Sequence, residues 1–159
     1  AYSLSKTYTL YGTRCGAMIC MAKTKEIADE FRRVCEYSSR GSWSNSARVG
    51  QVILSKIYAD KELLRKVDEE RAYYRDMLLA RGRAFEEEAE KAGLETVPFD
   101  AGFFVSIPCD DPDAISAKLE KQGLFIVPLA KGLRVSVASV SEEKCRKIPA
   151  MIKAAMDEK

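Results

Sequence analysis

The sequence predicts a mixed α/β chain in two parts, with the tail of one domain at residues 1–59 and an α+β unit at residues 60–159. A helical pattern runs without a proline through residues 61–92, and short apolar runs typical of strands follow Gly93. The length of 159 residues suits one full core, or a domain with a large appendage, but not two ordinary domains. Ala1 already lies within patterned sequence, so we expect the chain to be a piece of a longer polypeptide.

The first part is predicted to contain a strand, two helices and a loop. The apolar run CGAMICMA at residues 15–22 suits a buried strand by its length. Thr24 is a good N-cap for a helix whose apolar residues share one face: Ile27, Ala28, Phe31 and Val34. Residues 37–46, with five serines and a glycine, predict a loop. A second helix is expected over residues 47–58.

The longest predicted element links the two parts. Asp60 opens a helix over residues 61–92, in which Gly82 is the one glycine. At 1.5 Å per residue it would be roughly 45 Å long, more than a compact domain of this size needs. Such a helix usually connects two bodies, and Gly93 is expected to end it.

The second part is predicted to alternate strands and helices. Apolar runs predict strands at residues 94–99, 102–107, 124–127 and 133–137, with a helix at residues 113–122 between the second and third. Residues 141–159 are predicted to be helical, with Pro149 at the first position of a short last helix.

Composition excludes several kinds of function. The chain has no histidine, which removes Ser-His-Asp and Cys-His nucleophiles and every histidine-ligated metal site. Its 26 basic and 24 acidic residues are interspersed, so we expect no binding to nucleic acid. Five scattered cysteines fit neither a disulfide framework nor a zinc cluster, and no apolar stretch could span a membrane. We therefore expect a cytoplasmic protein with reduced thiols, no bound metal and no membrane partner.

The residues that suggest chemistry lie in the segment from Ser3 to Gly16. Lys6 stands among serine and threonine hydroxyls, and Arg14 follows eight residues later. Hydroxyls and a guanidinium form a phosphate-binding set, and a lysine beside it suggests an amine that forms a Schiff base and carries protons. The alternative is a polar loop that leads into a strand.

This segment resembles the pyridoxal-phosphate lysine signature of class I/II aminotransferases, S-x-S-K followed by G-x-R-x-G. The matching residues are Ser3, Ser5, Lys6, Gly12, Arg14 and Gly16. The resemblance implies that Lys6 carries pyridoxal 5'-phosphate (PLP), with Ser3 and Arg14 on its phosphate and Ser5 assisting. It implies an α/β, PLP-dependent transferase-like fold of type I. In that fold residues 1–59 end the large PLP-binding domain, and residues 60–159 form the linking helix and the complete small domain.

A second segment, GLRVSVA at residues 132–138, is similar to the aminotransferase strand whose arginine binds the substrate α-carboxylate. The resemblance gives that role to Arg134, and a guanidinium fork suits a carboxylate geometrically. A weaker similarity, at residues 101–105, places Phe104 on the substrate side. From composition alone, Arg134 is an outward residue of a strand and Phe104 belongs to a core.

The resemblance implies transfer of an amino group between an α-amino acid and a 2-oxo acid, in a homodimer. In this family the acidic partner of the pyridine nitrogen precedes the lysine, so we expect the chain to be inactive without the missing N-terminal half of the protein. Two alternatives remain open: a PLP-dependent C–S or β-lyase of the same fold, and a non-catalytic C-terminal domain.

Overall fold

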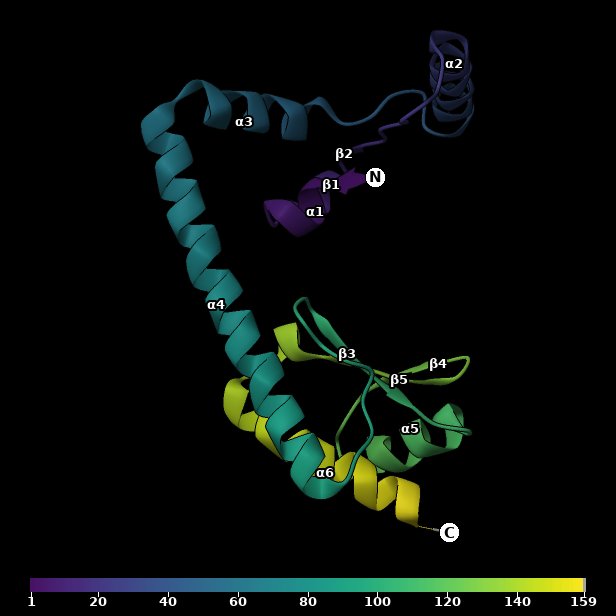
Figure 1. Cartoon of the computed structure of the whole chain (residues 1–159), viewed down its shortest axis with the longest axis vertical. Helices are drawn as coiled ribbons and strands as arrows, with labels where there is room; N and C mark the ends of the chain where they lie inside the picture. Colours follow the sequence, from purple (N-terminus) through teal and green to yellow (C-terminus); the bar gives the residue numbers. More distant parts are fainter. Residues whose placement is uncertain (159) are drawn as a thin grey trace. The chain divides into compact units, whose positions relative to one another are not determined.

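The computed structural model describes residues 1–158 as two compact units, one at residues 1–71 and one that begins at Ala72 (Figure 1). The helix α4 (Lys61–Ala92) contributes to both. The boundary expected at residues 59 and 60 lies between α3 and α4, and the assignment of residues 1–59 to a large domain stays a prediction. Within residues 1–158, every helix is too short or too polar to cross a membrane.

The first unit starts with two short antiparallel strands, β1 (Tyr2–Ser3) and β2 (Gly16–Ala17). The chain between them forms the helix α1 (Leu4–Thr7) and the 3-10 turn η1 (Tyr11–Thr13). A Cβ atom on Gly16 would lie 2.4 Å from the carbonyl oxygen of Tyr2, so the glycine permits the pairing. A small core holds this loop through Leu4, Tyr8 and Cys15, packed against Leu10, Leu54 and Val67.

The strand predicted at residues 15–22 is wrong except for Gly16 and Ala17. Beyond them Met18, Ile19 and Met21 are exposed by 68%, 73% and 98%. A strand requires a hydrogen-bonding neighbour, and within residues 1–158 this segment pairs with the two residues of β1. An apolar run therefore identifies a segment suited to burial, and the burial itself depends on other chain segments.

Two helices follow. Thr24 caps α2 (Lys25–Ser42) as predicted, because its hydroxyl accepts a hydrogen bond from Ile27 N. The loop predicted at residues 37–46 is wrong in its first half, since α2 continues to Ser42. Extension of a helix costs far less than its nucleation, so serines are tolerated in its last turns. The helix ends where Ser44, with φ of 72°, donates its amide to Ser39 O. The predicted second helix is confirmed as α3 (Arg48–Ala59).

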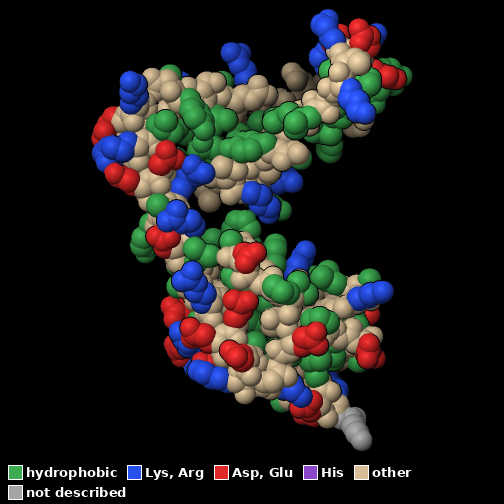
Figure 2. All heavy atoms as spheres, in the orientation of Figure 1, with side chains coloured by type: hydrophobic (Ala, Val, Ile, Leu, Met, Phe, Trp, Pro, Cys, Tyr) green, Lys and Arg blue, Asp and Glu red, His purple; other side chains and the backbone are tan. Residues whose placement is uncertain are grey.

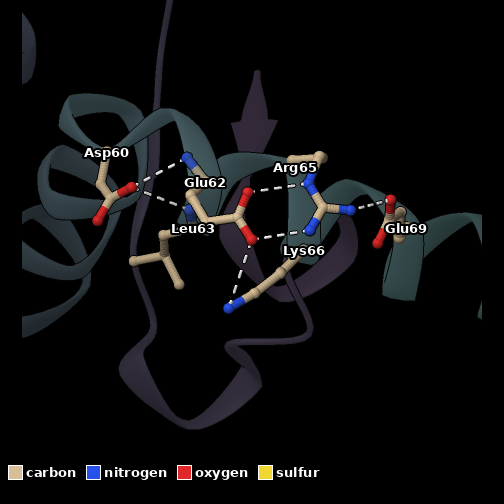
Figure 3. Close-up of polar contacts among 6 residues, drawn as sticks. All are labelled: Asp60, Glu62, Leu63, Arg65, Lys66 and Glu69. Carbon is tan, nitrogen blue, oxygen red and sulfur yellow. Dashed lines mark hydrogen bonds and ion pairs between the residues drawn. The ribbon is translucent and has the colours of Figure 1, made fainter.

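The helix α4 has the predicted bounds. Asp60 Oδ1 accepts hydrogen bonds from the amides of Glu62 and Leu63 at 2.9 and 3.0 Å (Figure 3), which satisfies two amides of the first turn. On the exposed side, Arg65 pairs with Glu62 and Glu69 (Figure 3). At the other end Gly93 has φ of 65°, and Leu94 N bonds Ala89 O at 2.8 Å.

The second unit contains a three-stranded antiparallel sheet in the order β3-β5-β4. Its strands are β3 (Phe104–Pro108), β4 (Val127–Leu129) and β5 (Gly132–Ser136). The last part of α4, α5 (Pro112–Lys121) and α6 (Glu142–Asp157) lie beside this sheet (Figure 1). One face of the sheet and the helices share a core whose fully buried members include Phe85, Val105, Ile107, Leu119, Leu133 and Ile152.

Three predicted boundaries in this unit are wrong. Residues 94–99 form no strand, because Pro98 lacks an amide for a ladder; one bond, from Val97 N to Ser106 O, is made instead. The strand expected at residues 124–127 is β4, which lies further on and tolerates Pro128 because it is an edge strand. Pro149 lies inside a continuous α6, where its ring is fully buried in the core.

Gly82 provides a test of the packing of α4. A Cβ atom here would lie 2.0 Å from the Phe99 ring, which packs against the core. We predict that Gly82→Ala lowers the free energy of unfolding by about 1–2 kcal/mol, since overpacking exceeds the gain in helix propensity. Urea unfolding measures the change.

Gly41→Ala is the matched control, because Gly41 is in α2 and has open space around its Cα. This variant is expected to be neutral or stabilising by up to about 1 kcal/mol. Equal stability of the Gly82→Ala and wild-type chains would contradict the assigned packing.

Candidate functional site

The loop between β1 and β2 is closed on itself. Leu4 N donates a hydrogen bond to Cys15 O at 3.1 Å, and both side chains are buried. This closure brings the helix α1, which carries Ser5 and Lys6, beside Arg14 at the end of η1.

The Arg14 guanidinium connects the parts of this loop. Its Nη1 lies 3.5 Å from Ser5 Oγ and donates to Tyr11 O at 3.1 Å. The same guanidinium lies over the Tyr11 ring at 4.7 Å, and Lys6 Nζ is 5.9 Å from the centroid of that ring. Two cationic side chains therefore lie over one aromatic ring on an exposed surface, and the Ser5 hydroxyl lies beside one of them. We call Ser3, Ser5, Lys6 and Arg14 the lysine-loop site.

The backbone of this loop is strained at two positions. Thr9 and Arg14 have φ of 54° and 47°, in the left-handed region that costs a non-glycine residue about 1 kcal/mol or more. Short bonds hold these turns, from Thr9 Oγ1 to Tyr8 O and from Thr13 Oγ1 to Leu10 O, both at 2.7 Å. The loop thus has a defined shape despite its exposure.

Ser3 is half-buried at the N-cap position of α1. Among the described residues its hydroxyl makes no capping bond to the first turn of α1, so that turn does not use the hydroxyl. Gly12 has open space around its Cα, whereas Gly16 is needed for the pairing of β1 with β2.

The second candidate group lies in the second unit, on the central strand β5. Arg134 pairs in register with Ser106 of β3 and Val127 of β4. Its neighbours Leu133 and Val135 are buried in the core, so Arg134 lies on the opposite face of the sheet. The guanidinium stacks on the Phe104 ring at 4.6 Å. Arg134 and Phe104, which we call the arginine-strand site, are thus brought together by the sheet, and their role toward a substrate stays a prediction.

The Nε atom of Arg134 indicates a position suited to ligand binding. Within residues 1–158 its Nε is buried and makes no hydrogen bond, a loss of about 1–3 kcal/mol for a buried donor. A planar anion such as a carboxylate would satisfy a guanidinium in this position. Two features hold the backbone near Arg134. Gly132 lets β5 lie close to β3, since a Cβ atom there would lie 2.3 Å from Ile107 O. Arg81 donates a hydrogen bond to Ala138 O, just after β5.

Sequence reasoning did not identify four residues that support the lysine-loop site. Tyr11 lies under the Arg14 guanidinium, and Arg71 binds Thr7 O. The hydroxyls of Tyr8 and Tyr58 bond each other. Tyr11 lies three residues before Arg14 inside the motif, so its position could have suggested it. Arg71 lies 64 residues from its partner Thr7 on a highly charged helix, and no local signal separates it from the surface arginines beside it.

No cluster of three or more metal-ligating side chains occurs within residues 1–158. In the same part of the chain all five cysteines are free, with Cys15 and Cys145 buried. Burial raises the pKa of the Cys145 thiol, which is typical of an inert core cysteine.

The sequence was compared with models of known families. The model described as aminotransferase class I and II matches residues 1–152. The chain belongs to this family. A comparison with curated protein sequences gave no match.

Solved aminotransferase structures share the fold. The chain is similar to an aminotransferase from Anaerococcus prevotii, with 35% identity and a TM-score of 0.91 over 99% of this chain and 38% of that one. A tryptophan-complexed mutant of the aspartate aminotransferase from Thermus thermophilus is 25% identical, with a TM-score of 0.62 over 95% of this chain and 38% of that one. The α/β fold of a PLP-dependent aminotransferase, inferred from two motifs, is confirmed.

A third similar structure is the aromatic-amino-acid aminotransferase from Burkholderia pseudomallei, solved covalently bound to pyridoxal phosphate. It is 24% identical, with a TM-score of 0.62, and the match covers 98% of this chain and 39% of that one. The chain thus spans about 38% of the length of the Anaerococcus and Thermus enzymes.

The Tyr8 hydroxyl allows a pH test of the small core formed by Leu4, Tyr8 and Cys15. It lies 2.8 Å from the Tyr58 hydroxyl, and burial followed by this hydrogen bond raises the pKa of Tyr8 above that of an ordinary tyrosine. The unfolded chain releases this proton near pH 10, about the reference value, and the folded chain retains it. We predict that the free energy of unfolding falls as the pH rises above about 10, toward the raised pKa of Tyr8.

Urea unfolding between pH 8 and 11 measures this decline, which should be smaller for Tyr8→Phe. Tyr73→Phe is the control, because Tyr73 is 66% exposed. The same decline in the Tyr8→Phe and wild-type chains would refute the explanation.

Proposed function

We propose that this chain carries the cofactor lysine and the substrate arginine of a PLP-dependent aminotransferase that acts on an α-amino acid and a 2-oxo acid. The observation that carries the proposal is the juxtaposition of Lys6, Ser5 and Arg14 in one closed loop of a chain from this family. These residues fit the cofactor, because a phosphate needs hydroxyl and guanidinium donors and an aldehyde needs a nearby amine.

Each side chain of the lysine-loop site has a role in this proposal. Ser3, Ser5 and Arg14 hold the phosphate of PLP, and Arg14 already has its guanidinium beside the Ser5 hydroxyl. Lys6 holds the cofactor and afterwards moves the proton at the α-carbon of the substrate. When bound, PLP supplies an electron sink for the charge that develops at that carbon.

The arginine-strand site has a different role. Arg134 binds the α-carboxylate of the substrate, which satisfies the buried Nε. The Phe104 ring, 42% exposed, supports the guanidinium from one side. Arginine suits this task better than lysine because its fork makes two parallel hydrogen bonds.

The surface of the first unit supports a proposal about further polypeptide. Hydrophobic side chains gather on this surface (Figure 2), and the large exposed ones include Met18, Ile19, Met21, Val34, Tyr37 and Trp43. Exposed apolar area of this kind marks an interaction surface. We propose that the N-terminal part of the aminotransferase fold, which includes the acidic partner of the cofactor ring, covers it. We propose further that the whole protein is a homodimer, and that the free cysteines reflect a reducing compartment such as the cytoplasm.

Reductive trapping tests the assignment of Lys6. The 159-residue chain is incubated with pyridoxal 5'-phosphate and borohydride, and the adduct is located by peptide mass mapping. We expect a phosphopyridoxyl adduct on Lys6 in excess of the surface lysines, and none at that peptide in Lys6→Ala. An adduct spread over exposed lysines alone would contradict the assignment.

The reaction type needs the complete enzyme. We expect amino-group transfer to 2-oxoglutarate, and a β-lyase would instead release ammonia and a 2-oxo acid from the donor alone. Arg134→Lys should lower kcat/KM by about tenfold or more, through loss of the bidentate pair. Steady-state kinetics measure this effect, with Arg32→Lys on the exposed face of α2 as control. Unchanged kcat/KM in Arg134→Lys would remove Arg134 from substrate binding.

A further inference from the structure

The residues that follow Lys6, at the carboxyl end of α1, are held by side chains that lie far away in the sequence. Arg71 of α4 donates its Nε to Thr7 O at 2.9 Å, and its guanidinium lies over the Tyr8 ring at 4.8 Å. The Tyr8 hydroxyl is 2.8 Å from the hydroxyl of Tyr58 on α3. Thr7 and Tyr8 are the two residues that directly follow Lys6.

The helix α1 depends on such contacts. It has four residues, too few to be stable alone, because nucleation of a helix fixes several residues for one hydrogen bond. On the amino side of Lys6, Leu4 is 3% exposed and its amide bonds Cys15 O. On the carboxyl side, the carbonyl of Thr7 is bound by Arg71. Lys6 thus lies between two anchored residues.

Arginine is suited to this position by its shape. A planar guanidinium can stack on an aromatic ring with its face and donate from its edge at the same time. Arg71 uses the face for Tyr8, Nε for Thr7 O and Nη1 for Asp68 at 2.7 Å. The Asp68 carboxylate therefore orients the guanidinium that binds the Thr7 carbonyl.

We propose that Arg71, together with the Tyr8 and Tyr58 pair, is a positioning device for Lys6. It fixes the direction of α1 so that Lys6 Nζ projects near the Tyr11 ring, on which the Arg14 guanidinium also stacks, and there captures the aldehyde of the cofactor. Arg71 acts through the backbone of Thr7 and touches neither cofactor nor substrate. The proposal rests on the function proposed for Lys6.

The test compares the trapping of pyridoxal 5'-phosphate by borohydride in the wild-type chain and in Arg71→Gln. The measured quantity is the initial rate of adduct formation on Lys6 relative to Lys25, an 86% exposed lysine on α2. We expect this ratio to fall about fivefold in Arg71→Gln, the factor that corresponds to one lost hydrogen bond. Arg71→Lys keeps a cation and a donor, so it should restore part of the ratio.

Arg65→Gln is the matched control. Arg65 lies on the same helix and, like Arg71, pairs with carboxylates of that helix, Glu62 and Glu69 (Figure 3). Its loss should leave the ratio of Lys6 to Lys25 unchanged. Circular dichroism and thermal melting of each variant separate the positioning of Lys6 from a general loss of structure.

The outcomes distinguish the two proposals. A wild-type chain that forms the adduct on Lys25 and other exposed lysines but not on Lys6 would overturn the function proposed for Lys6 and this inference with it. Equal ratios in wild-type and Arg71→Gln, with adduct on Lys6 in both, would overturn the positioning role alone. If Arg71→Gln fails to fold, Tyr58→Phe removes a single hydroxyl from the same device. It should lower the ratio in the same direction, and an unchanged ratio would overturn the proposal.

Discussion

The hydrogen bond from Leu4 N to Cys15 O is the constraint on which the lysine-loop site depends. Without it, the four residues of α1 would lose their anchor on the amino side of Lys6, and a helix this short is not stable alone. With it, the chain returns on itself, so that Ser5 lies within reach of the Arg14 guanidinium and Lys6 lies near the Tyr11 ring on which that guanidinium stacks. The buried side chains of Leu4 and Cys15 keep water away from that closure, so an exposed polar site stands on a small apolar core.

The arginine-strand site is also positioned by backbone pairing, here within the sheet of the second unit. Its position is set by the sheet, because β5 is central and alternates buried residues with Arg134. Gly132 allows β3 and β5 to approach, since any side chain there would meet Ile107 O. Among residues 1–158 the Arg134 Nε is buried without a hydrogen bond, and the packed opposite face of β5 stabilises the strand that carries it. In both sites, then, backbone pairing places a cationic side chain and an aromatic ring supports it.

The chain belongs to the class I and II aminotransferase family, and it covers 38% of a solved relative. The structure adds long-range contacts that support the lysine motif. The residues after Lys6 are tied to α3 and α4 by Tyr58 and Arg71, so long-range contacts support a turn that the local sequence cannot hold alone.

The sequence by itself determined what depends on neighbouring residues. Thr24, Asp60 and Gly93 bound their helices through bonds to residues at most five positions away, so their identity was sufficient. The candidate residues of the lysine-loop site and Arg134 were likewise proposed from two short motifs, and Phe104 from a weaker similarity at residues 101–105. Tertiary structure decided the rest: residues 18–22 find no strand partner within residues 1–158, and Pro149 stays within α6 because that helix is anchored in the core. It also decided the contacts of Tyr8 and Thr7 across 50 and 64 positions, since no local pattern encodes which distant side chain will meet a given turn.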